Sequence, residues 1–327
     1  MTRTLVPDQR RNMTRRLLSL VALTVVAAVL AGAPAQADAA PIRVGVNTQD
    51  FGAFANPFWK QARFRRVRYI VRYDVALRRR DRRYLTDYVS AARRNGVQVL
   101  MTFQAPFSFR CPRSRRCKAP SARKYRRAFR AFRRRFPSVR NIIPWNEVNH
   151  RSQPTFRKPR AAATYYKIVK RNCRGCTVVA ADVIDERNMV SYLRRFKRYV
   201  RGRRLWGLHN YKDTNPRRGQ TFGGTRKLLR TVRGSVWLAE SGGIVYFRLP
   251  NGRRLFRRSN ARANRALKRM FRIARRYRRR IKRIYVYDWQ QQVRRNRFDA
   301  GLLNKSGTPR PGYFTVRNRL RGRQFRP

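Results

Sequence analysis

The sequence predicts a (β/α)8 barrel in one large domain, and three observations carry this prediction. From residue 42 onward, apolar strand-like segments alternate with amphipathic helical segments at about 30 residues a unit, which is the spacing of βα units. Several of the predicted strands end directly at polar residues, as barrel strands do at the face that carries the site. The turn Gly45-Val46-Asn47 lacks the glycine-rich phosphate loop expected of the alternative fold, an open doubly wound sheet.

The predicted strands are short apolar runs rich in β-branched and aromatic residues, bounded by polar or glycine residues. They cover residues 42–47, 67–73, 97–103, 141–147, 177–183, 205–211, 236–240 and 284–289. The fourth run leads through Pro144 and Trp145 to Asn146 and Glu147, after which the chain turns polar. A buried strand that ends by presenting an amide and a carboxyl group has this pattern.

Each predicted strand is followed by a helix whose apolar residues keep the helical period. In residues 121–136 the apolar positions form one face, and arginines fill most of the others. The remaining predicted helices are a short one near Phe58, one from Asp81 to Gly96, and those near 158–172, 187–200, 225–233, 259–282 and 312–320.

Residues 1–41 are expected to be a signal peptide rather than part of the fold. Basic residues up to Arg16 precede the apolar run 17–33, and small-residue cleavage sequences follow it. Met13 is an equally suitable start, and a retained membrane anchor is the alternative to cleavage. Residues 42–327 are then expected to form one domain of a secreted protein, either free outside the cell or in the cell wall.

The chain carries 83 Lys and Arg against 14 Asp and Glu, a formal net charge of +69. Such a charge suits a nucleic acid, a membrane surface or an acidic polymer as partner. However, arginine fills the polar face of helix after helix, which favours a solvated surface over a dedicated patch. We therefore expect non-specific binding to polyanions, no specific nucleic-acid partner, and a monomer.

The four cysteines fall in two local pairs, Cys111 with Cys117 and Cys173 with Cys176. An even number in a secreted chain favours disulfides, and a four-thiolate zinc site is the alternative. The barrel model places the first pair after strand three and the second before strand five, at opposite ends of the barrel. This separation favours two local bridges, Cys111–Cys117 and Cys173–Cys176.

The chain holds three glutamates, and two of them, Glu147 and Glu240, end predicted strands four and seven. In the barrel model these two strand ends face each other across the mouth. Two carboxyl groups so placed can flank one bound sugar, as in glycosidic-bond hydrolysis. The third glutamate, Glu186, and the strand-end residues Asp74, Asp182 and Asp185 are expected instead to pair with arginines. With two histidines in the chain, a histidine-based metal site or triad is not expected, and neither is a cofactor.

These strand-end residues resemble those of the clan A glycoside hydrolases, which carry Asn-Glu after strand four and a second glutamate after strand seven. Asn146-Glu147 and Leu238-Ala239-Glu240-Ser241 match these motifs, and His209-Asn210-Tyr211 matches a His-x-Tyr of strand six. Strand eight of such enzymes supplies a tryptophan floor for the sugar, for which Trp289 is the candidate. Strand two supplies an arginine beside the nucleophile, and here Arg72 and Arg68 are both candidates.

The resemblance implies a retaining glycoside hydrolase acting on a β-linked polysaccharide or glycoside. Glu147 would be the acid/base and Glu240 the nucleophile. The implied substrate-binding residues are Asn146, His209, Tyr211, Trp289 and Arg72. The alternative is a catalytically inactive barrel of the cell envelope that binds carbohydrate or polyanions, and His209 as a purely structural hydrogen-bonding residue stays open.

Overall fold

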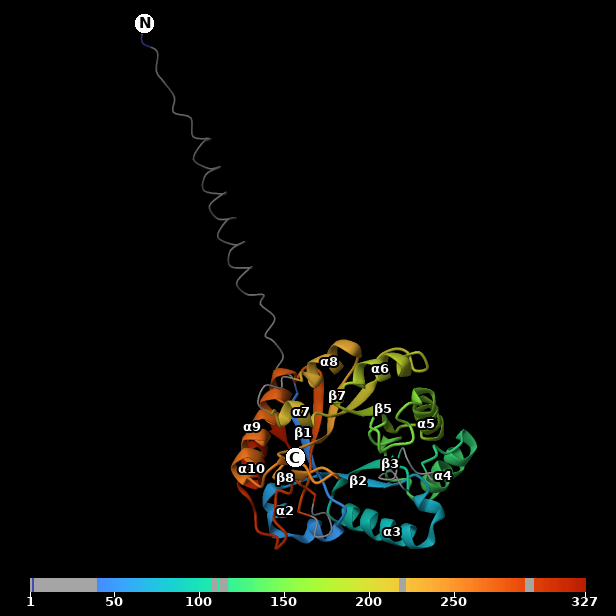
Figure 1. The fold of residues 1–327 in the computed structure, drawn as a ribbon, viewed down its shortest axis with the longest axis horizontal. Helices are drawn as coiled ribbons and strands as arrows, with labels where there is room; N and C mark the ends of the chain where they lie inside the picture. The colour runs from blue at the N-terminus through green and yellow to red at the C-terminus, as the bar shows by residue number, and fades with distance from the viewer. Residues whose placement is uncertain (1, 3–39, 107–110, 112–116, 218–221, 292–296) are drawn as a thin grey trace. The chain divides into compact units, whose positions relative to one another are not determined.

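In the computed structural model, eight parallel strands form a closed barrel (Figure 1). The structure describes residues 2, 40–106, 111, 117–217, 222–291 and 297–327, and its folded unit runs from Pro41 to Pro327. The barrel strands are β1 Ile42–Asn47, β2 Arg66–Arg72, β3 Gln98–Gln104, β4 Asn141–Ile143, β5 Thr177–Ile184, β6 Leu205–His209, β7 Val236–Ser241 and β10 Ile281–Val286. Pairing of β10 with β1 closes the ring, which confirms the predicted (β/α)8 fold.

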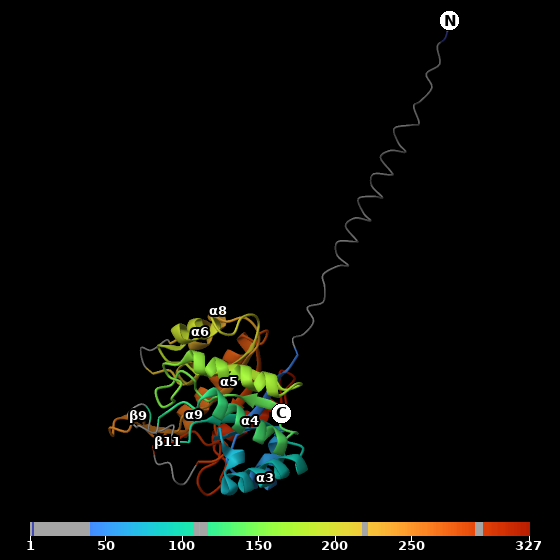
Figure 2. The same cartoon turned by 90° about the vertical axis from the view of Figure 1, so that its right-hand side faces the viewer.

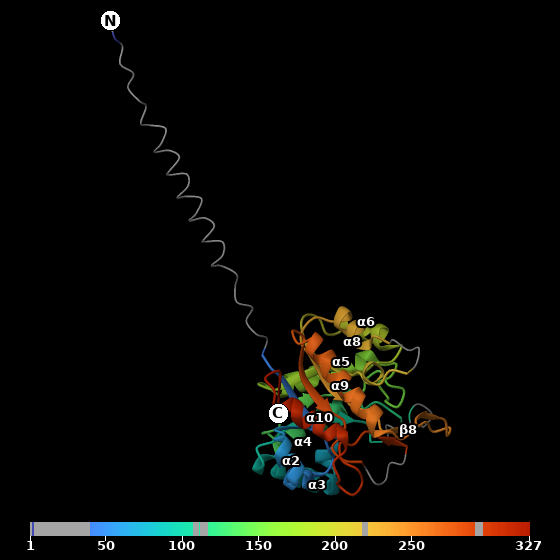
Figure 3. The same cartoon turned by 90° about the vertical axis from the view of Figure 1, so that its left-hand side faces the viewer.

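Helices surround the barrel on its outside, as the two side views show (Figures 2 and 3). They are α2 Pro57–Ala62, α3 Arg79–Arg94, α4 Ala122–Arg135, α5 Pro159–Asn172, α6 Met189–Lys197, α7 Tyr211–Thr214, α8 Gly224–Thr231, α9 Asn260–Arg276 and α10 Pro311–Leu320. Short 3-10 helices cover Phe51–Ala55 and Val75–Leu77, and a final strand β12 (Phe325–Arg326) lies beside β1. The long predicted helices are therefore present, with ends shifted by a few residues.

Predicted strands four and six are shorter in the structure than in the sequence pattern. The strand β4 ends at Ile143 because Pro144 has no N–H to donate to the sheet. After β6 ends at His209, Tyr211 begins the short helix α7. Both regions keep their polar residues at the same end of the barrel, so the predicted placement of the site does not change.

The segment after β7, which the sequence suggests is a loop, forms a small antiparallel sheet together with residues that follow β10. Its strands are β8 Tyr246–Arg248, β9 Arg254–Phe256 and β11 Phe298–Asp299, with β8 in the middle. In Figure 2, β9 and β11 extend from the body of the barrel. Three-residue strands give too short an alternation to be recognised in the sequence.

The core has two layers, one inside the barrel and one between the barrel and its helices. The inner cluster consists of Leu100, Ile143, Val179, Trp237, Ala239 and Tyr285. The outer layer takes the apolar faces of the helices; in α4 these are Tyr125, Ala128, Phe129 and Phe132. The arginines of α4 lie mostly on its exposed face, in agreement with a solvated surface.

Both expected disulfides are present. Cys111 and Cys117 follow β3, with 5.0 Å between their Cα atoms, and Cys173 and Cys176 precede β5, with 5.5 Å between theirs. The expected signal peptide lies outside the described residues. Within those residues, no helix has the length and apolar character needed to cross a bilayer.

At the middle of the barrel a buried aspartate fits against a glycine. Asp182 on β5 is fully buried, and its neighbour on β6 is Gly207. A Cβ atom at position 207 would lie 2.2 Å from Asp182 Oδ1. A glycine is therefore required here for the aspartate to fit inside the barrel.

We expect Gly207→Ala to lower the free energy of unfolding by about 1–3 kcal/mol, because overpacking a closed interior forces its neighbours to move. Urea denaturation followed by circular dichroism measures this change. Gly322→Ala is the control, since its nearest neighbour would lie 3.5 Å away. Equal stability of the two variants would contradict the close approach of Gly207 to Asp182.

Candidate active site

The fully buried Arg68 on β2 joins the strand ends at the centre of the barrel. Its side chain has no exposed surface, and its guanidinium contacts side chains from the other barrel strands. The partners are Asn47 on β1 (3.0 Å), Thr102 on β3 (3.1 Å), Asn146 after β4 (2.7 Å), Asp182 on β5 (3.4 Å) and Glu240 on β7 (2.5 Å). Burial would lower the pKa of Arg68, but the charges of Glu240 and Asp182 outweigh burial and raise it. Arg68 therefore stays a cation.

Glu240 lies near the end of β7, and each of its two carboxylate oxygens has a donor. Arg68 donates to Oε2, and the Tyr211 hydroxyl donates to Oε1 at 2.9 Å. These two donors fix the orientation of the carboxylate. Tyr211 is near Glu240 because α7 begins two residues after the end of β6, next to β7.

Glu147 lies in the turn after β4, and the backbone around it is held from both sides. The Asn146 N–H donates to the carbonyl of Phe103 on β3 (2.7 Å), and the Val148 N–H donates to that of Asp182 on β5 (2.8 Å). Between them Glu147 has a φ of 42°, in the left-handed region that residues other than glycine seldom adopt. Backbone strain of this kind is typical of functional sites.

The side chain of Trp145 anchors the same turn. It is buried, stacks on Tyr165 with 5.0 Å between ring centroids, and donates from Nε1 to Gln153 Oε1 at 3.1 Å. Because Trp145 fills the outer core, the alternation of side chains directs Asn146 to the barrel interior. The apolar residues before Asn146-Glu147 thus position the polar ones.

His209 at the end of β6 links Glu147 to Asp182. Its Nδ1 lies 3.1 Å from Glu147 Oε1, and its Nε2 lies 3.0 Å from Asp182 Oδ2. Burial would lower the pKa of His209, but the charges of Asp182 and Glu240 and the hydrogen bonds to Asp182 and Glu147 raise it to about 10. His209 is therefore an imidazolium at neutral pH and donates from both nitrogens.

The same contact determines the ionisation of Glu147. Burial would raise the pKa of Glu147, but the hydrogen bond from His209 and the positive charges nearby outweigh burial and lower it to about 2. Glu147 and His209 together thus hold one proton at neutral pH, and that proton lies mainly on the histidine.

Glu147 and Glu240 are close together and both reach the surface. Oxygen atoms of the two carboxylates and a nitrogen of His209 all lie within 4.8 Å of one another. The side chains of Glu147 and Glu240 are 16% and 12% exposed, whereas His209 is fully covered. These three groups are close enough to share a metal ion, but a cation there would compete with Arg68 and with the imidazolium. The arrangement fits two carboxylates that act on a molecule entering from the surface.

Aromatic residues border the two carboxylates. The ring of Tyr211 lies 5.9 Å from that of Phe298 and 6.5 Å from that of Tyr287, centroid to centroid. Phe298 in turn contacts Phe247 of β8 at 5.2 Å, so the small sheet after β7 extends the aromatic border outward. Tyr287 and Phe298 did not stand out in the sequence, where one aromatic among many carries no specific signal.

The structure contradicts the expectation that Trp289 forms the floor for a sugar. Trp289 is 2% exposed, and its ring packs edge-on against Trp59, Phe64 and Tyr313 between the barrel and its outer helices. In a continuing strand, residues 285, 287 and 289 would lie on the same side of the sheet. The strand ends at Val286, so this alternation does not extend to residue 289. The aromatic residue after β10 that lies nearer the site is Tyr287, whose ring packs against Tyr211 and Phe298.

The arginine beside Glu240 is Arg68, and the assignment of Arg72 to the site is therefore corrected. Arg72 lies four residues further along β2 than Arg68. It pairs with Asp74 (2.5 Å) and Asp81 (3.5 Å). Its side chain is 28% exposed. Residues 68 and 72 have the same parity on the strand, so alternation alone does not distinguish them.

The other acidic residues mostly behave as expected. Asp74 and Asp182 pair with arginines, while Glu186 pairs with Lys212 at 3.4 Å. Asp185 instead accepts backbone N–H groups at the start of α7. Asp182 also has a role that the sequence did not predict, because it orients His209. From the sequence, a lone aspartate within a strand was expected to pair with an arginine, but its other partner could not be identified.

We expect Arg68→Gln to lower the free energy of unfolding by about 3–5 kcal/mol, because it leaves the buried Asp182 and Glu240 without their cation. Arg72→Gln, which removes a half-exposed arginine from the same strand, is the control and should change it by about 0–1 kcal/mol. Guanidinium chloride denaturation of both variants measures the difference. Similar losses in the two variants would contradict a central role for Arg68.

A search of protein-family models gives no match to this chain, and a search of curated protein sequences gives none either.

Solved structures do resemble it, and they are glycoside hydrolases. A GH5_18 variant from Streptomyces cattleya, in complex with Manβ1-4GlcNAc, matches with a TM-score of 0.60 at 16% identity, over 86% of this chain and 80% of that one. The GH39 enzyme from Xanthomonas axonopodis pv. citri matches with a TM-score of 0.60 at 15% identity, over 89% and 68%. A monomeric β-xylosidase from Caulobacter crescentus matches with a TM-score of 0.57 at 12% identity, over 85% and 67%. The chain thus has the (β/α)8 barrel fold of the clan A glycoside hydrolases.

Proposed function

We propose that this protein is a retaining glycoside hydrolase that cleaves β-linked glycosidic bonds. The observation that carries the proposal is the Glu147–Glu240 pair at the carboxyl end of the barrel, with carboxylate oxygens within 4.8 Å and both side chains partly exposed. In retaining enzymes the two carboxyl groups are about 5–5.5 Å apart, whereas inverting enzymes need a wider gap for a water. The short separation therefore supports the retaining reaction.

In this proposal Glu240 is the nucleophile. It attacks the anomeric carbon, and the bond to the leaving oxygen breaks as a glycosyl ester forms on Glu240. The donors Arg68 and Tyr211 hold the carboxylate of Glu240 in position for the attack. Asn146 accepts from Arg68 through its Oδ1, and its Nδ2, which donates to Gln104 Oε1 at 3.5 Å, has a second proton that can go to a sugar hydroxyl.

The proposal assigns the proton for the leaving oxygen to the Glu147–His209 pair. Glu147 faces the surface and transfers the proton, while His209 stores it at neutral pH. In the second step Glu147 accepts a proton from the water that hydrolyses the ester. Asp182 keeps the imidazole oriented for this exchange by its bond to Nε2.

The alternative is an inactive barrel that binds carbohydrate without cleaving it. One observation favours this alternative: an acid/base residue needs a proton, and the pKa of Glu147 is lowered to about 2. The proton held by His209, 3.1 Å from Glu147, is the reason that we prefer the enzyme.

The neighbours also support a β-linked substrate. They include a complex with Manβ1-4GlcNAc, a β-xylosidase and a β-glucuronidase. The predicted signal peptide places the proposed activity outside the cell or in its wall, on a polysaccharide or glycoside. No cofactor and no metal enter the proposed reaction.

The two glutamates can be separated by removing each in turn. Glu240→Ala should abolish hydrolysis of all substrates. Glu147→Ala should lose natural substrates by about 10²–10⁴-fold but keep first-step activity on aryl glycosides whose leaving phenol is acidic, since these need no proton. Azide should restore turnover of Glu147→Ala and give the β-glycosyl azide, whereas any azide product of Glu240→Ala should be the α-anomer. NMR of the products assigns the anomers.

Glu186→Ala is the control. Glu186 forms an ion pair with Lys212 rather than joining the Glu147–Glu240 pair, so its loss should leave turnover unchanged. The same azide anomer from both site variants, or full hydrolysis by either one, would refute these roles. Wild-type protein inactive on every aryl glycoside and polysaccharide tested would favour the inactive alternative.

The pH dependence of kcat/KM tests whether His209 holds the proton. The pair loses its proton only as pH rises through the His209 pKa of about 10, so wild-type kcat/KM on a substrate with a poor leaving group should stay high up to that range. In His209→Gln the proton must reside on Glu147 itself, whose pKa is far lower, and the alkaline limb should move to lower pH by several units. His150→Gln removes the other histidine, which lies 3.6 Å from Glu147, and should move the limb much less. An unchanged limb in His209→Gln would show that His209 does not hold the proton.

A further inference from the structure

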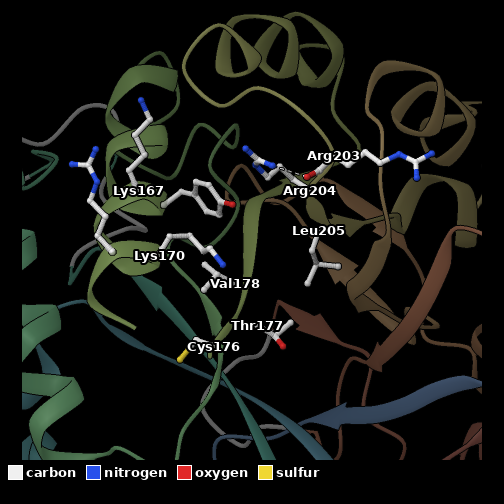
Figure 4. A pocket seen from close by; sticks show the side chains of 10 residues that line it. Lys167, Lys170, Cys176, Thr177, Val178, Arg203, Arg204 and Leu205 are labelled. Atoms are coloured by element: carbon white, nitrogen blue, oxygen red, sulfur yellow. Dashed lines mark hydrogen bonds between the residues drawn. The ribbon is translucent and has the colours of Figure 1, made fainter. Parts of the chain in front are cut away.

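The opposite face of the barrel carries a pocket with a strongly basic lining. The pocket has a volume of about 540 Å³ and lies where α5 ends and where β5 and β6 begin (Figure 4). Of its lining residues, Lys167, Lys170, Arg171, Arg203 and Arg204 are cationic, and none is acidic. Its volume lies in the range of pockets that bind small ligands.

The positive charges of this pocket are not neutralised by the protein. Within the part of the chain that the structure describes, none of the five cations forms an ion pair with a carboxylate. The guanidinium of Arg204 donates from Nη1 to the carbonyl of Arg203 at 2.7 Å, but its Nε is buried without an acceptor. A buried donor without an acceptor is unfavourable, and a bound anion would satisfy it.

Helix α5 alone does not explain this cluster. Lysine and arginine in the last turn of a helix complement its negative end, which accounts for Lys170 and Arg171. Arg203 and Arg204, however, come from the segment before β6 and add charge at the same place. The end of a helix carries about half a negative charge, so five cations leave a large positive excess.

We propose that this pocket binds a phosphate group of a linear phosphodiester polymer. Arg and Lys are the side chains that bind phosphate oxygens, arginine by a planar fork of donors and lysine as a point charge. In Figure 4 the side chains of Lys170 and Arg204 lie around the middle of the pocket, while those of Lys167 and Arg203 extend outward on opposite sides. The outer pair would contact the neighbouring phosphates of a chain whose central phosphate lies in the pocket.

The lining favours a polymer without bases over a nucleic acid. Proteins that bind single-stranded nucleic acids stack the bases on exposed aromatic rings. The aromatic residue of this lining, Tyr166, is 7% exposed and offers no free face for stacking. A polyol phosphate, in which small hydroxylated units separate the phosphates, needs only the cations and a polar group such as the Thr177 hydroxyl.

The pocket is separate from the candidate active site. Thr177 lines the pocket at the start of β5, and Asp182 contacts His209 five residues further along the same strand. At roughly 3.3 Å per residue, the two places lie about 16 Å apart. The inference therefore does not rest on the proposed hydrolysis, and both ligands can be bound at once.

The test compares two double variants that each remove two positive charges. Lys170→Gln/Arg204→Gln changes the pocket, and Lys268→Gln/Arg272→Gln changes the exposed face of α9. Binding of a poly(glycerol phosphate) chain is measured by isothermal titration calorimetry at about 0.15 M and about 1 M salt, where screening suppresses the general attraction. At the higher salt we expect the wild type to bind, the pocket variant to bind about tenfold or more weakly, and the α9 variant to change less than about twofold.

A single-stranded DNA with the same number of phosphates distinguishes the ligand, and we expect the wild type to bind it more weakly at the higher salt. Absence of binding by the wild type at about 1 M salt, or equal loss in both variants, would overturn the pocket as a site. DNA bound as tightly as poly(glycerol phosphate), and lost in the pocket variant, would overturn the choice of ligand. Near-ultraviolet circular dichroism of both variants shows whether the fold is unchanged.

Discussion

The site depends on one buried cation. The guanidinium of Arg68 lies inside the barrel without exposed surface, and it contacts side chains from five other places around the ring. Removing a charge from water is very unfavourable unless it is paired and hydrogen-bonded. Asp182 and Glu240 provide the pairing, while Asn47, Thr102 and Asn146 use the remaining donors. The positions of Glu240 and of the Asn146 amide at the barrel mouth are thus fixed by the need to satisfy this arginine.

The same principle explains the use of acidic residues in a chain with so few of them. Of the 12 acidic residues in the part of the chain that the structure describes, seven are buried: Asp74, Asp182, Asp185, Asp213, Asp288, Asp299 and Glu240. Several of the buried aspartates stabilise the structure around them. Asp299 pairs with Arg310, and Asp213 accepts backbone N–H groups at the start of α8. The surface therefore has few carboxylates, and it carries most of the positive charge of the protein.

The sequence was sufficient to predict the barrel, because strand and helix periods are properties of neighbouring residues. It also placed Glu147, Glu240, His209 and Tyr211 at one end of the barrel, since the carboxyl ends of parallel strands meet there. The resemblance also implied that a tyrosine and an arginine contact Glu240, but which arginine it is and how Glu147 is held were not predictable. Choosing Arg68 over Arg72 requires knowing how far along β2 the barrel mouth lies, and choosing Tyr287 over Trp289 requires knowing where β10 ends. The link from Asp182 through His209 to Glu147 likewise depends on the register of three strands, which no local pattern encodes.

The closure of the ring by β10 against β1 has a consequence for how this protein folds. The polar centre draws groups from strands that are far apart in the chain, such as Asn47 and Glu240, which both bond to Arg68. In a partly assembled barrel Arg68 would stay in water, and Glu240 would have no fixed position. A chain that stops before β7 therefore lacks Glu240, and a chain that stops before β10 leaves the barrel open, so that water reaches the guanidinium of Arg68. The complete and water-free environment of this cation is expected only once β10 has paired with β1.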